Sequence, residues 1–221
     1  MKKTILFILL LHLVSCKEAI KEPLGLNFYF ENPQPVNDSE LSKFPDRFQG
    51  RYLNSDSTSI IIDDKCILSE HDYGFKIHKK DLDSIKDIFE FNNGKLIDKE
   101  TNKPVESRFI GDSLKIFNKW TDTLFCISAY NKVKRIHGNL ILNKKDSIFW
   151  KIKTLRLEKD TLKIQYLYSE EDLRKIGSIT KVKAVKIDSF SYIFKPTRRE
   201  FKNIMKVKNL GDEQQFKKVS K

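Results

Sequence analysis

Short apolar runs alternate with polar turns over residues 44–210, and this pattern limits the possible fold more than any other feature of the sequence. Tyr73, Phe75 and Ile77 alternate with Gly and Lys, which places their side chains on one face of a strand. Asn92-Asn93-Gly94 separates two such runs and predicts a tight hairpin, because Asn and Gly both tolerate a positive φ. Short strands joined by tight turns predict an antiparallel meander rather than strand–helix–strand units.

An aspartate followed by serine or threonine recurs before several of these runs and is typical of a turn that leads into a strand. The six pairs begin at Asp56, Asp112, Asp122, Asp146, Asp160 and Asp188. Their spacing is irregular, so the sequence predicts no structural repeat. The expected fold is therefore mainly β, with one antiparallel domain over residues 44–210 that is either barrel-like or a sandwich.

Gly50-Arg51-Tyr52, near the start of that domain, resembles the Gly-x-Trp entry of lipocalin-type barrels, with Tyr in the place of Trp. The resemblance covers three residues and slightly favours the barrel-like alternative. Aromatic and basic residues also interleave at Phe149-Trp150-Lys151 and over residues 192–195. They fit either cross-strand packing in the core or an apolar cavity with a basic rim, which would suit an amphipathic anionic ligand.

The last part of the chain carries two helix signals, so one or two short helices are expected there. Ser169-Glu170-Glu171-Asp172 predicts a capped helix start, with Gly177 as the expected end. Thr197-Arg198-Arg199-Glu200 has the form of a capping box, and it precedes an apolar helix face made of Phe201, Ile204 and Met205. The opposite face of this helix fits either solvent or anionic lipid head groups and contains Arg198, Arg199, Lys202 and Lys206.

Two segments outside the domain are expected to lack regular structure. Residues 16–43 have the proline content and polarity of a tether, and the polar residues 211–221 are expected to form a frayed tail. Within the tether, the apolar residues 26–30 would either dock on the domain as an edge strand or contact a partner, and docking is the favoured alternative. Residues 81–88 fit either a helical turn or an irregular loop.

The first sixteen residues have the parts of a secretory signal. Lys2 and Lys3 precede an apolar run, residues 5–11, that is shorter than the roughly 20 residues a membrane-spanning helix needs. The leader closes with Leu13-Val14-Ser15-Cys16, which resembles the lipobox that lipoprotein signal peptidase cleaves in bacterial lipoproteins. An ordinary signal or a buried N-terminal element is the alternative.

The lipobox resemblance implies a location rather than an activity. Residues 1–15 would be removed as a signal peptide, and Cys16 would carry fatty acids such as palmitate that anchor the protein to a membrane of the cell envelope. Lys17 stands where an aspartate would favour the inner membrane in some bacteria, so the outer membrane is the expected location.

The formal net charge is +12, but the lysines are spread along the chain with many acidic residues between them. This distribution is typical of a solvated surface, and export argues against nucleic acid as a partner. An exported protein meets an oxidising compartment, so Cys66 and Cys126 could form a disulfide. Both cysteines also lie in apolar runs, where a buried free cysteine is common, and the sequence leaves the two alternatives open.

Residue types that carry catalysis are scarce outside the predicted turns. His71 and His78 are odd and even positions of one predicted strand and so point to opposite faces, which argues against a shared metal ion. The sequence contains no glycine-rich phosphate loop, no histidine–glutamate metalloprotease motif and no nucleophile elbow. Most aspartates are explained by turns, so a glycosidase pair of carboxylates is not predicted. No catalytic residue, metal or cofactor is therefore expected.

These observations favour a non-enzymatic envelope module that binds a ligand or another envelope protein, with a small periplasmic hydrolase of unidentified site as the alternative. Three structural features would separate the possibilities. An enclosed apolar pocket would favour a ligand, and a cleft with a perturbed buried carboxylate or histidine would favour catalysis. An exposed apolar patch without a pocket would favour a protein partner.

Overall fold

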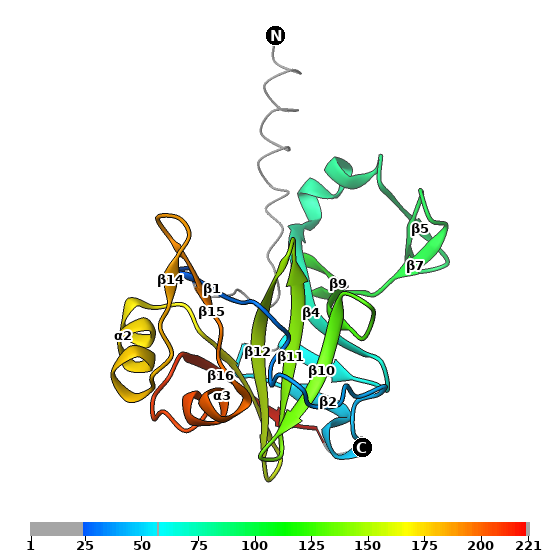
Figure 1. The fold of residues 1–221 in the computed structure, drawn as a ribbon. Helices are drawn as coiled ribbons and strands as arrows, with labels where there is room; N and C mark the ends of the chain where they lie inside the picture. The colour runs from blue at the N-terminus through cyan, green and yellow to red at the C-terminus, as the bar shows by residue number, and fades with distance from the viewer. Residues whose placement is uncertain (1–23, 57, 220–221) are drawn as a thin grey trace.

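The computed structural model describes residues 24–56 and 58–219 of the chain (Figure 1). The expected signal peptide and Cys16 lie outside these residues, and they remain predictions from the sequence. Over the ranges that the structure describes, no helix is both long enough and apolar enough to cross a membrane.

The described chain is mainly β, as the sequence predicts, with sixteen strands and four short helices. The strands are β1 (Asn27–Phe30), β2 (Gly50–Leu53), β3 (Thr58–Ile62), β4 (Cys66–His78), β5 (Phe89–Asn92), β6 (Lys95–Asp98), β7 (Lys103–Val105), β8 (Ser107–Ile110), β9 (Ser113–Cys126), β10 (Asn131–Ile136), β11 (Asn139–Asp146), β12 (Phe149–Glu158), β13 (Thr161–Tyr166), β14 (Val185–Lys186), β15 (Ser191–Phe194) and β16 (Asp212–Lys218). The helices are the 3-10 helices η1 (Asp46–Phe48) and η2 (Lys79–Ile85) and the α-helices α2 (Glu170–Ile179) and α3 (Arg198–Ile204).

Thirteen of the described strands form one large sheet, and β5, β6 and β7 form a small separate sheet. The order in the large sheet is β14-β15-β1-β12-β13-β16-β2-β3-β4-β9-β8, and β10 and β11 join it through β12. All strand pairs are antiparallel except β1 with β15. The path through the described strands ends at β14 and at β8 without closing, so the fold is sandwich-like rather than barrel-like.

The large sheet folds over so that strands from its two halves enclose a core. Tyr52 and Ile60 from β2 and β3 meet Leu140 and Leu155 from β11 and β12 in one cluster, and all four side chains are fully buried. A second cluster lies beneath α2 and α3 and includes Phe201. In Figure 1, β10, β11 and β12 pass in front of β2, with the first core between the layers. Alternating apolar residues therefore drive the folding of the sheet onto itself.

The hairpin signal and both helix starts are confirmed by the structure. Asn93 and Gly94 have φ values of 48° and 78° and join β5 to β6. Each α-helix opens with a capping box, centred on Ser169 for α2 and on Thr197 for α3. These features depend on residues close in sequence, which is why the sequence predicts them correctly.

Two of the local predictions are wrong. Helix α2 continues past Gly177, and it ends where the Thr180 hydroxyl donates a hydrogen bond of 2.7 Å to the carbonyl oxygen of Ile176. Asp122 does not precede a strand but lies inside β9. For residues 81–88, where the sequence left two alternatives, the helical turn is present as η2.

The tether predicted for residues 16–43 is wrong over its described part. β1 pairs with β15 on one side and with β12 on the other, so it is an internal strand rather than an edge strand. Phe28 and Phe30 are buried, and their rings stack on Phe194 with centroids 5.5 Å and 5.6 Å away. The apolar segment thus docks on its own domain, and the aromatic side chains supply the burial that holds it there.

Buried polar contacts hold the proline-rich segment that follows β1. The Gln34 backbone N–H donates to Asn143 Oδ1 at 2.6 Å, and Asn143 Nδ2 donates back to the Gln34 carbonyl at 2.9 Å. The ammonium of Lys134 donates to the carbonyl oxygens of Pro33 and Pro35, and burial lowers the pKa of this lysine. Buried side chains therefore satisfy the carbonyl oxygens of the prolines in this segment. The segment has the composition of a flexible linker but is held in place by these contacts.

The frayed tail predicted for residues 211–221 is also wrong over its described part. β16 pairs with β13 along its length and with β2 at its end. Phe216 lies opposite Leu162, and both side chains are buried. The rest of β16 is polar, so the strand is held mainly by backbone pairing, along its length with β13 and at its end with β2.

Candidate interaction surface

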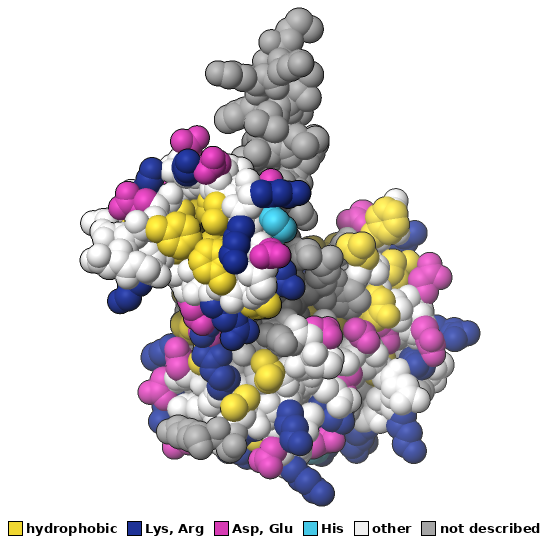
Figure 2. Space-filling model, turned by 180° about the vertical axis from the view of Figure 1, so that it is seen from behind, with side chains coloured by type: hydrophobic (Ala, Val, Ile, Leu, Met, Phe, Trp, Pro, Cys, Tyr) yellow, Lys and Arg dark blue, Asp and Glu magenta, His cyan; other side chains and the backbone are white. Residues whose placement is uncertain are grey.

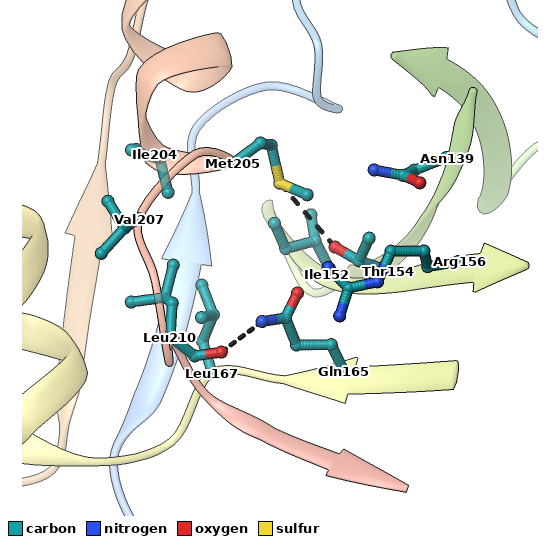
Figure 3. Close-up of a pocket in the computed structure, with 10 residues that line it drawn as sticks. All are labelled: Asn139, Ile152, Thr154, Arg156, Gln165, Leu167, Ile204, Met205, Val207 and Leu210. Carbon is teal, nitrogen blue, oxygen red and sulfur yellow. Dashed lines mark hydrogen bonds between the residues drawn. The ribbon is translucent and has the colours of Figure 1, made fainter. Parts of the chain in front are cut away.

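A small cavity lies between β12, β13 and the segment that follows α3 (Figure 3). At its edges, the Thr154 hydroxyl donates to Met205 Sδ at 3.8 Å, and Gln165 Nε2 donates to the carbonyl oxygen of Leu210. Its volume is about 40 Å³. This is room for about one water molecule, whereas ligand pockets usually measure roughly 300–1,000 Å³. The cavity is therefore too small for an amphipathic ligand.

The interleaved aromatic and basic residues pack across strands. Trp150 is buried, and the ammonium groups of Lys132 and Lys145 lie 5.7 Å and 5.9 Å from the centre of its ring. Lys151 lies over the ring of Tyr29 at 5.0 Å. These lysines cover aromatic faces with their aliphatic stems and charged ends, as cation–π pairs do. Of the two alternatives for this segment, cross-strand packing is therefore the one that the structure supports, rather than an apolar cavity with a basic rim.

The described groups with shifted pKa values lie at turns, helix caps, surface ion pairs and core positions. The backbone N–H of Thr101 lowers the pKa of Asp98 in an exposed turn, and the backbone N–H at the N-cap of α3 lowers the pKa of Glu200. Burial raises the pKa of Tyr52 to about 12, and its hydroxyl donates to the carbonyl oxygen of Phe48 at 2.9 Å. Each shift has a structural cause, and none of these groups lies in a cleft of the kind that favours catalysis.

The histidines occupy separate positions in the described chain. His78 accepts a hydrogen bond at 3.3 Å from the backbone N–H of Lys80 at the start of η2, while His71 lies opposite Trp120 in the middle of the paired strands. His137 has a positive φ of 49° and lies in the turn between β10 and β11. Among the described residues, no group of three or more His, Cys, Asp or Glu side chains could hold a metal ion.

A short polar section of β4 and β9 separates two apolar cores. Ser69 and His71 are two residues apart on β4, and Asp122 is paired with Ser69 across the ladder. The Ser69 hydroxyl and His71 Nδ1 are buried and have no hydrogen-bond partner in the described part of the chain. Asp122 instead accepts a hydrogen bond of 2.7 Å from Trp120 Nε1. Because Ser69 is 0% exposed, its hydroxyl does not face a surface at which a substrate could arrive.

The structure joins Cys66 and Cys126 in a disulfide, and the two residues are paired in register where β4 begins and β9 ends. The segment that this bond closes, residues 66–126, is termed the arm. β4 and β9 extend from the body as a ribbon, which carries η2, the β5–β7 sheet and β8 at its outer end (Figure 1). The outer end has a small core of its own, formed by Ile77, Leu96, Leu114 and Ile116.

The outer end of the arm exposes apolar side chains. Phe91 and Phe109 are each 50% exposed, and their rings stack with centroids 6.3 Å apart at an interplanar angle of 16°. The ammonium of Lys79 lies 5.5 Å from the centre of the Phe109 ring. Figure 2 shows apolar side chains gathered on this part of the arm, with charged side chains around them. The stacked pair Phe91–Phe109 is termed the aromatic patch.

The arm holds a large share of the exposed apolar side chains of the described chain. Six of the fourteen exposed large hydrophobic residues belong to it, namely Phe75, Ile88, Phe91, Phe109, Ile110 and Trp120. The arm has 10 Lys and Arg residues and 11 Asp and Glu residues, whereas the whole chain has 42 and 30. The positive charge of the protein therefore lies outside the arm. A surface with exposed aromatic residues and balanced charge is typical of a protein-binding site.

The basic face of α3 is partly committed to contacts within the protein. Arg198 forms a two-pronged ion pair with Asp38, with Nη2 and Oδ2 separated by 3.0 Å. This pair joins α3 to the segment after β1, so Arg198 has a structural partner in place of a lipid head group.

Comparison with known proteins gives no relative: no family model, no curated protein and no solved structure matches the chain. The candidate site therefore depends on the geometry of the chain itself. Alternation along β4 and β9 predicts a strand pair, and the sequence named a Cys66–Cys126 disulfide as one of two alternatives, but neither indicates that the bond lies at the base of an arm with a small core at its tip. Those features arise when residues far apart in sequence are brought together.

Proposed function

We propose that the protein is a lipid-anchored module of the bacterial cell envelope that acts without catalysis and binds another envelope protein through the arm. The leader and Leu13-Val14-Ser15-Cys16 support the anchor, because they have the parts and the order of a lipoprotein signal. Fatty acids on Cys16 would provide the attachment, and stable attachment needs more than one acyl chain. Lys17 supports the outer membrane as the location.

The observation that carries the proposed binding function is the aromatic patch. Two stacked phenylalanines lie half exposed at the outer end of the arm, where contact with water is unfavourable. A partner that covers the two rings gains the free energy of burying them. Covering the exposed half of one Phe ring removes roughly 100 Å² from water, which is worth roughly 2 kcal/mol. The two rings together could therefore supply a large part of the affinity of a modest interface.

The size of the cavities supports a protein partner over a small ligand. The enclosed cavity in Figure 3 has a volume of about 40 Å³. A larger depression of about 380 Å³ lies on the arm but is open to solvent, and it is lined by residues 94–96 and 104–107. An open depression on the same arm as the exposed aromatic residues fits a side chain or a short segment of another protein better than it fits an enclosed ligand.

The anchor is tested by membrane fractionation of the wild type and the Cys16→Ala variant, with mass spectrometry of the mature N-terminus. We expect the wild type in the membrane fraction, beginning at an acylated Cys16, and the variant in the soluble fraction. A mature protein that begins at Met1, or a Cys16 without acyl chains, would contradict the proposed anchor.

The binding surface is tested by a photocrosslinking amino acid placed at Phe91 or Phe109 in the lipidated protein. We expect a discrete crosslinked product that contains one envelope protein. Ile148, which is also exposed but lies in the turn between β11 and β12, provides the matched control. Equal crosslinking at Ile148, or no product at either arm position, would refute the arm as the binding surface.

A further inference from the structure

The described chain begins beside the hairpin formed by β14 and β15. The backbone N–H of Asn27 donates to the carbonyl oxygen of Phe190 at 2.7 Å, and Leu26 donates to Tyr168 at 2.6 Å. β1 then runs parallel to β15 from this point. Leu24 is eight positions after Cys16, and an extended chain covers at most about 3.6 Å per position, or about 29 Å in total. A lipid anchor at Cys16 therefore keeps this hairpin close to the bilayer.

Residues 181–190, termed the basic hairpin, combine lysines with exposed apolar side chains. Val185, Ile187 and Phe190 are 52%, 46% and 65% exposed. The same ten residues contain Lys181, Lys183 and Lys186 and a single acidic residue, Asp188. Figure 1 shows the β14–β15 hairpin projecting from the body beside the start of β1. This combination differs from the arm, whose charges are balanced.

The exposed residues of the basic hairpin are not needed to hold its base. Val182 is buried and belongs to the cluster beneath α2 and α3, and Val185 pairs with Ile193 across the β14–β15 ladder. The carboxylate of Asp188 accepts a hydrogen bond of 2.8 Å from the backbone N–H of Phe190, which fixes the turn. The hairpin is thus held by its base and its turn, while Ile187 and Phe190 are left available for contact.

The charges near the basic hairpin leave it positive. Lys186 is close enough to Asp188, and Lys181 close enough to Glu200, to lower the pKa of each carboxyl, although the backbone hydrogen bonds contribute more to both shifts. Both carboxylates are engaged locally, Asp188 in its turn and Glu200 in the capping box of α3. The three exposed lysines thus outnumber the two nearby carboxylates. The resulting positive charge complements an anionic surface.

We propose that the basic hairpin is a second, non-covalent membrane contact, in which its lysines meet the phosphates of anionic lipids and Ile187 and Phe190 enter the head-group region. The nearness of the hairpin to the bilayer depends on the proposed lipid anchor, whereas its apolar and basic character does not. Apolar side chains flanked by lysines bind membrane interfaces in this way. A second contact of this kind would orient a protein that is otherwise anchored only through Cys16.

The test uses the mature chain with Cys16→Ala, so that no acyl chain contributes, and vesicles of phosphatidylglycerol and phosphatidylcholine or of phosphatidylcholine alone. We expect binding to the anionic vesicles that weakens as salt is added. Each lysine near an anionic surface contributes roughly fivefold to binding, so replacing Lys181, Lys183 and Lys186 by Gln should weaken binding on the order of 100-fold. Replacing Lys65, Lys159 and Lys217 by Gln removes the same charge elsewhere and should change binding by less than about fivefold.

Insertion is followed separately with Phe190→Trp, whose fluorescence should shift to shorter wavelength on anionic vesicles. Leu53→Trp on β2, which four strands separate from β15 in the sheet order, should not shift. No binding to anionic vesicles, equal weakening by both lysine triples, or equal shifts of both tryptophans would overturn the proposal. Circular dichroism of each variant confirms that the fold is retained. Acylation of Cys16 and crosslinking at the aromatic patch are measured independently, so a failure of the hairpin contact is distinguishable from a failure of the proposed function.

Discussion

Removal of the disulfide between Cys66 and Cys126 should destabilise the protein strongly. The bond closes a loop with a sequence separation of 60, and it lies at the base of the arm, where β4 begins and β9 ends. The chain-entropy model relates the stabilisation to the length of the closed loop, and for this loop it gives about 4 kcal/mol at 25 °C. The variant Cys66→Ala/Cys126→Ala, made with Cys16→Ala so that no free thiol is left, should lose about 2–4 kcal/mol.

Urea unfolding of the mature chain measures this loss, with fluorescence and circular dichroism as independent probes. The Cys16→Ala protein in a reducing agent should unfold with the same midpoint as the variant, because both lack the bond. Hydrogen exchange should report the largest loss of protection in the arm, whose outer core contains four buried side chains. A loss of less than about 1 kcal/mol, or unchanged protection in the arm, would refute the view that the disulfide stabilises the arm by joining its two strands at the base.

Three further predictions concern the body. Phe30→Ala should cost about 3–5 kcal/mol because the ring is fully buried, whereas Phe91→Ala in the exposed aromatic patch should cost much less; equal losses in urea unfolding would contradict the assigned core. Asn143→Ala should cost about 1–3 kcal/mol, because the buried N–H of Gln34 loses its acceptor; an unchanged free energy of unfolding would show that water replaces the side chain. Burial raises the pKa of Tyr52 to about 12 from its ordinary value of 10. The contribution of the neutral Tyr52 hydroxyl to the free energy of unfolding is therefore complete below pH 10 and is lost as the pH rises to about 12. The loss is at most about 3 kcal/mol, and Tyr52→Phe should lose less stability over this range than the wild type; parallel curves would exclude Tyr52 as a cause.

The two exposed surfaces of the protein have different chemistry, and this difference predicts different behaviour with salt. The arm has balanced charge and stacked aromatic rings, so binding to it should depend little on ionic strength. The basic hairpin has three lysines and one aspartate, so binding to it should weaken clearly as salt is added. A protein with both surfaces could hold a fixed orientation on a membrane while the arm remains free to bind.

Sequence patterns predicted the elements whose geometry is set within a few residues. The Asn93-Gly94 turn and the capping boxes at Ser169 and Thr197 form as predicted because turn conformation and helix capping depend on neighbouring residues. Gly177 shows the limit of such signals. A glycine permits a helix to end but does not require it, and the packing of α2 on the second core carries the helix two residues further.

The sequence by itself determined that the described chain is mainly β and antiparallel, and it predicts a lipoprotein-like leader, because alternation, turn residues and a terminal signal are local patterns. Only the tertiary structure decided that β1 lies inside the sheet, that β16 is a strand, and that Cys66 meets Cys126. Each of these depends on pairing between distant segments, whose free energy comes from backbone hydrogen bonds and burial that no short window of sequence contains. The aromatic patch and the basic hairpin share this origin, since a side chain becomes exposed only when the fold leaves it uncovered.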